Sequence, residues 1–446
     1  MCHLENIGGR YYKRYQEKIF RRRRLTRSKR KSRCAKYSHQ YNRKSLEIWY
    51  PILLKKFKKF GFVDEQYVND RGYIVVPVKF SLNANFDQTI VVFKQMVSEY
   101  ILGKYSLTID FYQCEQSDIA TFTLLNVIYK TLCKLGINYN RDRYQKVVKD
   151  IEFKPSRKDV KTNKFLAAFD YCPLPEESND ESLYKPLRAM SGKLADKYRD
   201  NAKPATCAKI AEFIQSASDP YGYVLVDKAR SLIERYAAEV LNNAEDHSYH
   251  RSEWYVNGIA FKEVQHGIEI IEVNLAIMNI GPSMYEGFEE TKEVNNENYS
   301  KVKNLYTIHE EKFTKPHQFS RETLYMLYML NEGISRLKYK DESRGNGTMS
   351  FINAFMTLGD YGDKNPDFAP SLDIISGHGV LAFDSKYRPF INGDFHQISL
   401  NEAQDIRELP DERCLKTNNE YFPGTILECK IYLNREHIIS KVDGND

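Results

Sequence analysis

The sequence has no long apolar run. No stretch of its 446 residues approaches the roughly eighteen consecutive apolar residues that a membrane-spanning helix requires. The first residues are polar and then basic, without the apolar core of a secretory signal peptide. These two absences predict a cytoplasmic protein that does not insert into a membrane.

The cysteines lack the spacing of a metal site or a redox motif. The eight cysteines are scattered along the chain, and no two of them form a C-x-x-C pair. Zinc sites and disulfide frameworks depend on closely spaced or regularly paired cysteines. The pattern therefore predicts reduced thiols, in agreement with a cytoplasmic location.

The charge of the chain is divided unequally. Residues 10–44 contain 16 Lys or Arg and one acidic residue, a net charge of +15, whereas the remainder has 50 basic and 59 acidic residues, a net charge of −9. Such a density of like charge predicts that residues 1–45 form a flexible head. Because Tyr and Phe alternate with the basic residues, we expect residues 10–44 to bind nucleic acid or another polyanion. A solubilising tail and docking on the acidic body are the alternatives.

The next part of the chain alternates between strand and helix patterns. Strand patterns at 73–80 and 106–111 are each followed by a helical pattern, at 88–100 and 119–135. The alternation predicts a small α/β domain over 46–138.

This domain resembles a STAS domain in one local feature: a strand ending Ile109-Asp110-Phe111, a polar loop at 112–118 and then an amphipathic helix. The resemblance implies a protein partner, because in STAS antagonists of anti-sigma factors a serine of this loop is phosphorylated by a kinase. Ser117 is the serine of this loop, and its alternative role is a helix cap. The charged, proline-containing residues 139–205 are predicted to form a linker with some helix.

The stretch 231–248 carries the most informative pattern of the chain. Its apolar residues recur at helical spacing, which predicts an amphipathic helix: Leu232, Ile233, Tyr236, Ala237, Val240, Leu241 and Ala244. Glu239 and Asn243 lie four residues apart, so they share one side of that helix. A carboxylate can orient a water or take its proton, and an amide oxygen can bind Mg²⁺. Alone, such a pair is more typical of an ordinary surface helix.

Four segments together resemble the GHKL superfamily of ATP-binding domains, which includes gyrase, the ninety-kilodalton heat-shock chaperone, histidine kinases and MutL. EVLNNAEDHS resembles the N-box, and 273–284 and 343–355 resemble the two glycine boxes. FPGTILECKIYL, at 422–433, resembles the closing Gly-Thr strand. Four such segments in the family's order, over about two hundred residues, are far more specific than a single glycine motif.

The resemblance implies the fold of residues 206–446. These residues would form a two-layer α/β sandwich of the Bergerat type, with a mixed sheet and helices on one face. Residues 284–343 take the place of the lid that closes over ATP. Their first part is acidic and polar, which predicts an irregular segment, and a long amphipathic helix is predicted at 320–337.

The resemblance also implies roles for single residues near the nucleotide. Glu239 would activate or orient the attacking water, and Asn243 would bind Mg²⁺. His247 matches a position near phosphate, although a helix-end histidine would look the same. Asn279 takes the place of the family's Asp, which accepts a hydrogen bond from the adenine amine. Gly281 lets the backbone approach the ligand, while Ser283 replaces the second glycine of the box.

The remaining implied residues lie further along the chain. Gly345 and Gly347 precede a predicted helix at 349–358, where backbone N–H groups and the helix dipole would face phosphate, with Arg344 beside them. Thr425 would lie near the adenine pocket.

Two classes of GHKL protein are not expected, because the sequence lacks a feature that each of them requires. No histidine lies between His39 and His247, so a histidine-kinase phosphoacceptor helix is not expected. Thirteen residues follow Leu433, so the transducer domain of gyrase or MutL is not expected either. We predict a Mg²⁺-dependent ATPase that acts as a conformational switch. In one form of this prediction, nucleotide binding also makes the chain form a homodimer. The alternatives are an anti-sigma-type serine/threonine kinase and a nucleic-acid-binding protein with a degenerate nucleotide site. By family analogy, the context is bacterial regulation or defence.

Deleting residues 1–44 should abolish binding to nucleic acid and leave nucleotide binding unchanged, because +15 of charge lies in residues 10–44. Affinity of the full chain should fall steeply with salt as phosphate counterions are released. Fluorescence anisotropy with a labelled oligonucleotide, over a salt series, measures both effects. Binding that survives the deletion or ignores salt contradicts the prediction.

Overall fold

The computed structural model describes most of the chain after the basic head. The described residues are 57–69, 71–139, 150–173, 184–193, 202–218, 227–246, 253–265, 268–316, 318–331, 349, 352, 369–383, 386–392 and 395–433. The chain divides into two compact units, residues 1–59 and residues 60–446. The predicted head at 1–45 lies outside the described residues. None of the described helices is long and apolar enough to cross a membrane, and the six described cysteines are free thiols, as predicted.

The largest sheet has five strands in the order β6-β7-β8-β12-β9. The strands are β6 (Tyr184–Lys193), β7 (Glu253–Gln265), β8 (Ile268–Asn279), β12 (Leu415–Leu433) and β9 (Ser371–Phe383). All four pairings are antiparallel, so the expectation of a mixed sheet is wrong for these strands. The short link between Gln265 and Ile268 explains part of this, because parallel neighbours need a crossover of about a dozen residues or more.

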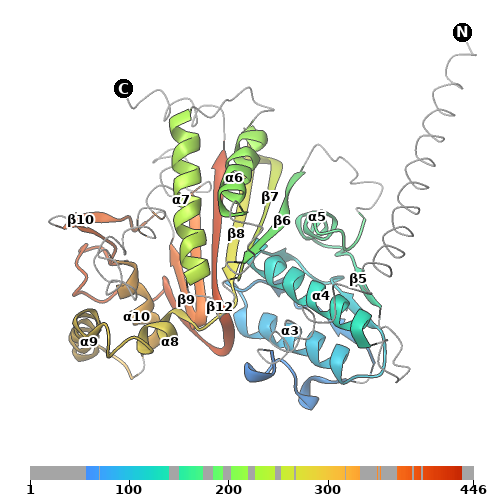
Figure 1. The fold of residues 1–446 in the computed structure, drawn as a ribbon, viewed down its shortest axis with the longest axis horizontal. Helices are drawn as coiled ribbons and strands as arrows, with labels where there is room; N and C mark the ends of the chain where they lie inside the picture. The colour runs from blue at the N-terminus through green and yellow to red at the C-terminus, as the bar shows by residue number, and fades with distance from the viewer. Residues whose placement is uncertain are drawn as a thin grey trace, which may run out of the picture. The chain divides into compact units, whose positions relative to one another are not determined.

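One face of the five-stranded sheet is apolar. Alternate strand residues such as Val256, Leu275 and Leu427 belong to a core shared with helices. These helices are α6 (Ala202–Ser218), α7 (Asp227–Asp246) and α10 (Arg321–Leu330). In Figure 1, α6 and α7 run along the sheet, and α10 lies beside β9. This side of the sheet is therefore covered by helices, in agreement with the predicted α/β class.

The opposite face is covered as well, by residues 60–173, here called the N-terminal layer. Its helices are α3 (Phe86–Ile101), α4 (Ile119–Tyr139) and α5 (Val160–Ala168), and α3 and α4 contact β12, β8 and β7 (Figure 1). Apolar side chains of this face meet the layer, among them Phe261, whose ring lies edge-on to Phe165 of α5. The face also carries buried polar side chains: Asn257, Glu272, Asn274, Asp373 and Glu428. The sheet is therefore covered on both faces, and the predicted 46–138 and 206–446 domains pack as layers of one unit.

The buried polar side chains of this face are matched by polar groups of the N-terminal layer. Asn257 donates to the Thr123 hydroxyl of α4 at 3.1 Å. Glu272, whose side chain is 3% exposed, forms an ion pair with Lys161 of α5. Burial raises the pKa of Glu272, but the two lysines, Lys161 and Lys430, together with an Asn274 hydrogen bond, lower it below its usual value overall. Burial of these groups is tolerated because each has a partner.

The N-terminal layer has its own small sheets. Its parallel strands lie in the order β1-β3-β5, namely β1 (Tyr73–Val75), β3 (Leu107–Asp110) and β5 (Ile151–Lys154). A second parallel pair joins β2 (Lys79–Phe80) to β4 (Gln116–Ser117), and the short helix η1 (Glu65–Tyr67) precedes β1. The helices predicted at 88–100 and 119–135 are confirmed as α3 and α4. The strand predicted at 73–80 is divided into β1 and β2 around Pro77, which has no N–H to donate.

The predicted linker at 139–205 contributes ordered elements. Strand β5 pairs with β3, helix α5 packs on the N-terminal layer, and β6 is the outer neighbour of β7. The linker prediction is wrong for β5 and β6, whereas α5 agrees with the helix that was expected within 139–205. The two strands are stabilised by pairing with residues distant in sequence, a contribution that local charge and proline content do not reveal.

The predicted irregular part of the lid is helical. Residues 284–331 form α8 (Met284–Glu289), α9 (Asn296–Glu311) and α10, and stacked or edge-on aromatic rings join them, among them Phe288, Tyr299 and Tyr325. Helix α10 ends at Leu330, before the predicted end at 337. Asn331 adopts an extended conformation there, and its side chain donates to the carbonyls of Leu327 and Tyr328. The short strands β10 (Phe390–Asn392) and β11 (Phe395–Gln397) pair in a separate ribbon.

The Phe122→Ala substitution should lower the free energy of unfolding by about 3–5 kcal/mol, the usual cost of truncating a buried Phe. Phe122 is fully buried, and its ring stacks on Phe165 at 4.9 Å and on Phe169 at 5.6 Å. Tyr112→Ala is the control, because Tyr112 is 50% exposed and should cost less than about 1 kcal/mol. Urea unfolding measures both variants, and equal losses would contradict the packing.

Candidate functional site

Helix α7 places the first two predicted site residues. Ile233, Ala237 and Leu241 are buried against the sheet, as their helical spacing predicts. Glu239 and Asn243 are half-buried and lie at the edge of this apolar face. Both side chains therefore remain partly open to solvent while their helix is fixed to the core.

The last turn of α7 is held by α6. Lys203 of α6 pairs with Glu245 and donates to the Asn242 side-chain oxygen at 2.8 Å. Glu245 is 6% exposed, so its charge needs this partner. The turn that carries Asn243 and Ala244 thereby has a fixed position against the sheet.

Strand β8 ends at a buried amide that joins three segments. Asn279 is 1% exposed. Its Oδ1 accepts a hydrogen bond from the Thr425 N–H at 2.9 Å, and its Nδ2 donates to the Ala244 carbonyl at 3.0 Å. The side chain thus links β8 to β12 on one side and to the last turn of α7 on the other.

These two bonds explain an amide at position 279. Thr425 presents a donor and Ala244 presents an acceptor, so the side chain between them must accept on one side and donate on the other. An amide does both, whereas an ionised carboxylate only accepts. Asn279 therefore has a structural role of its own, and its contact with an adenine amine stays a prediction.

The Gly-Thr segment approaches β8 through a distortion of β12. The pairing of β12 with β9 shifts register between Thr417 and Thr425. Gly424 has φ +136°, and a Cβ there would lie 2.2 Å from the Asn279 carbonyl oxygen. Glycine is required at this position because a side chain would collide with β8. The Gly281 N–H reaches the Pro423 carbonyl at 3.4 Å, so the first predicted glycine box and the predicted Gly-Thr strand meet here.

Ser376 of β9 connects this meeting point to α8. Its hydroxyl donates to the Gly424 carbonyl at 2.8 Å and lies 2.9 Å from the Thr425 hydroxyl. The same oxygen accepts the Met284 N–H at 2.8 Å. Sequence reasoning missed Ser376, because nothing local marks a strand serine as a crossing point of three segments.

Ser283 has a different role from the glycine that it replaces. Its hydroxyl accepts the Glu286 N–H, and the Glu286 carboxylate accepts the Ser283 N–H, which makes a capping box for α8. The spacing Ser-x-x-Glu is the sequence signature of such a box and was available in the sequence. Ser283, which departs from the glycine pattern, thus begins helix α8 as its N-cap.

The segments around Ala244, Asn279–Gly281 and Gly424–Thr425 therefore come together at one place, here called the three-segment junction. It contains or adjoins the predicted residues Asn243, Asn279, Gly281 and Thr425, and Glu239 lies about one turn earlier on α7. Four further predicted residues, His247, Arg344, Gly345 and Gly347, lie outside the described residues. Their convergence on the junction stays a prediction.

The loop serine of the N-terminal layer is also placed. The Ser117 hydroxyl lies 2.8 Å from the Thr162 hydroxyl of α5, and Ser117 is half-buried. Asp118, not Ser117, caps α4, since its Oδ1 accepts the Thr121 N–H at 2.6 Å. The alternative role of Ser117 as the helix cap is therefore wrong.

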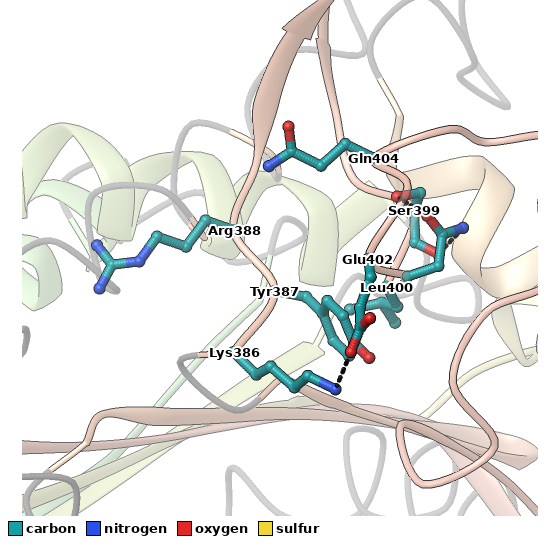
Figure 2. Close-up of a pocket in the computed structure, with 8 residues that line it drawn as sticks. Lys386, Tyr387, Arg388, Ser399, Leu400, Glu402 and Gln404 are labelled. Atoms are coloured by element: carbon teal, nitrogen blue, oxygen red, sulfur yellow. Dashed lines mark hydrogen bonds and ion pairs between the residues drawn. The ribbon is translucent and has the colours of Figure 1, made fainter.

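A surface pocket of about 240 Å³ lies away from the predicted residues. Figure 2 shows its lining from the turn after β9 and the turn after β11, with the Lys386 ammonium turned to the Glu402 carboxylate at 3.0 Å. Leu400 and Gln404 in this lining have positive φ angles of 55° and 49°. The pocket is polar and of mixed charge, and it includes no residue predicted for the nucleotide.

Comparisons of the chain with protein-family models, with curated proteins and with solved structures gave no match.

The Asn279→Asp substitution should lower the free energy of unfolding at pH 8 by roughly 1–3 kcal/mol, the cost of an unsatisfied buried polar group. It keeps the acceptor for Thr425 but sets a carboxylate oxygen against the Ala244 carbonyl. At pH 5 the loss should shrink, because a protonated carboxyl donates again. Urea unfolding at both pH values measures this. The exposed Asn242→Asp is the matched control and should change little; equal effects at the two positions would contradict the bridging role.

Proposed function

We propose that the chain binds ATP with Mg²⁺ at the three-segment junction and hydrolyses it as a conformational switch. The observation that supports this most is the Asn279 side chain, which joins the last turn of α7 to the Gly-Thr segment of β12. Three of the four segments that resemble the GHKL boxes thereby lie together, although up to about 180 residues separate them along the chain. Chance resemblance of unrelated segments would not require them to meet.

The exposure of the α7 side chains fits the proposed chemistry. Glu239 and Asn243 are half-buried on a helix whose other face is fixed to the core, so they combine a fixed backbone with access from solvent. The Asn243 amide oxygen would hold Mg²⁺, which when bound would neutralise phosphate charge. The Glu239 carboxylate would orient a water and accept its proton as the water oxygen attacks phosphorus.

The adenine end would lie where Asn279 and Thr425 meet. The Asn279 oxygen has a second lone pair beyond the one that accepts from Thr425. The Thr425 hydroxyl, 2.9 Å from the Ser376 hydroxyl, supplies a further polar group. Both residues are at least half-buried, as expected of groups that select a base by hydrogen bonds in a site with little water.

The hydrogen bonds of Ser376 support the switch. A ligand that displaces Thr425 or Gly424 also disturbs Ser376, which holds the first N–H of α8 through Met284. Helices α8, α9 and α10 pack together through aromatic rings, so they would respond as a group. Only a ligand with different affinities for the two arrangements can drive such a change. The basic residues 10–44 would bind the polyanion that the switch controls.

Glu239→Ala should leave ATP binding nearly intact and slow hydrolysis by roughly 10²–10⁴-fold, the usual contribution of a general base. Asn243→Ala should abolish the Mg²⁺-dependent part of binding. Glu234→Ala is the control: Glu234 lies on the same helix, pairs with Arg230 at 3.1 Å, and should not affect turnover. Calorimetry measures binding, and release of labelled γ-phosphate measures hydrolysis.

The fate of the label separates the proposal from its competitors. Free phosphate is the expected product. Label transferred to protein would replace the ATPase with a serine/threonine kinase. Absence of any ATP binding to the wild-type chain would overturn the proposed function altogether.

A further inference from the structure

Three carboxyl groups are buried together where the N-terminal layer meets the five-stranded sheet. Asp373 of β9 and Glu428 of β12 face each other in the strand pairing, and each residue is 7% exposed. Asp118 approaches them from the N-terminal layer, at the start of α4. These three residues are here called the carboxyl cluster. It lies on the opposite face of the sheet from the three-segment junction.

Each member of the cluster is bound across or along the contact. The Asp373 Oδ2 accepts from the Asn83 side chain at 2.6 Å, and the Glu428 Oε1 accepts from the Ile119 N–H at 3.3 Å. The second oxygens of Asp118 and Glu428 are buried and have no hydrogen-bond partner among the described residues. A buried carboxylate oxygen without a partner is costly when charged and much less so when protonated.

The basic groups around the cluster are too few to neutralise three carboxylates. Lys416 donates to Asn83 Oδ1 at 2.8 Å, and Lys430 acts on both Asp373 and Glu428. On the α3 side, Lys94 pairs with Glu420, and Asp87 accepts the Glu420 N–H. On the α5 side, Lys161 pairs with Glu272 of β8. Among the described residues, two lysines therefore face three acids.

The direction of proton binding follows from this environment. Burial raises the pKa of Asp373 to about 7 and that of Asp118 above its usual value. Burial, and then the neighbouring Asp118 and Asp373, raise the pKa of Glu428 strongly. These folded-state pKa values exceed those of the unfolded chain, which are about 4. The contribution of the cluster to folding stability is therefore complete below about pH 4 and is lost as the pH rises. For Asp373 the loss runs from about pH 4 to about 7.

We propose that docking of the N-terminal layer on the sheet is proton-linked through Asp118, Asp373 and Glu428. The layer is held closely while the cluster retains protons. It loosens when the carboxyl groups ionise and repel one another across the contact. The contact between α4 and β12 is then the part of the molecule most sensitive to alkaline pH. This inference does not depend on nucleotide binding.

Hydrogen exchange in the full chain tests the proposal. The first-turn amides of α4 report the contact, since the Ile119 N–H is bonded to Glu428. After correction for intrinsic rates, their exchange should rise by at least about tenfold from pH 5.5 to pH 8.5, which corresponds to a shift of one pKa unit in one group. In Glu428→Gln and Asp373→Asn, which keep the shape without the charge, most of this rise should disappear.

Glu272→Gln is the matched control. It removes a buried carboxylate from the same face of the sheet. Burial raises the pKa of Glu272, but two lysines and Asn274 act on the carboxylate and lower its pKa overall. This variant should weaken the contact at every pH above the unfolded-state pKa of Glu272. The rise in hydrogen exchange from pH 5.5 to pH 8.5 should remain. A rise that persists unchanged in both cluster variants, or one that only Glu272→Gln removes, overturns the proposal.

A measurement on the wild-type chain covers the case in which the variants do not fold. Infrared spectra should show the carbonyl band of a protonated carboxyl at pH 5.5. As the pH is raised, this band should disappear over the same pH range in which hydrogen exchange of the α4 amides increases. Absence of the band at pH 5.5, or its loss without any change in exchange, overturns the proton linkage.

Discussion

The candidate site depends on one side chain that both donates and accepts inside the protein. Asn279 accepts from Thr425 and donates to Ala244, and almost none of it is exposed. Neither bond can be replaced by water without opening the core, so strand β8, the bulged part of β12 and the last turn of α7 are held in one arrangement. The close approach at Gly424 and the crossing at Ser376 are consequences of that arrangement.

Elements with a local periodic signal could be predicted from the sequence. Helices α3, α4 and α7 carry apolar residues at helical spacing, and their cores are buried as expected. Strands β5 and β6 could not be predicted, because β5 lies between charged residues and β6 is stabilised by pairing with β7 over sixty residues away. Only the antiparallel pairing of β7 with β8 had a local signal, the short link between them. The directions of the other strands were hidden, since their pairing is decided by contacts across the whole chain.

The site was predictable to the extent that resemblance supplied it. The order of the segments led to the expectation that α7, Gly281 and Thr425 approach one another, and the described structure brings them together. Resemblance misled where this chain differs from the pattern. The pattern gave no reason for an amide at position 279 or a serine at position 283, whereas the Asn279 amide bridges a donor and an acceptor and Ser283 caps α8. Hydrogen-bond partners, which a pattern of residue types does not contain, decide such roles.

Strand β12 physically connects the three-segment junction to the carboxyl cluster. Its residues alternate between the faces of the sheet, so Thr425 meets Asn279 on one side and Glu428 meets the N-terminal layer on the other, three residues away. A strand that is hydrogen-bonded to both neighbours cannot shift at one of these residues and stay fixed at the other. Release of the N-terminal layer at Glu428 should therefore change the position of Thr425 more than that of residues on the outer strand β6. In this way a protonation event on one face can reach the three-segment junction, the proposed nucleotide site, on the opposite face without any change in the order of the strands.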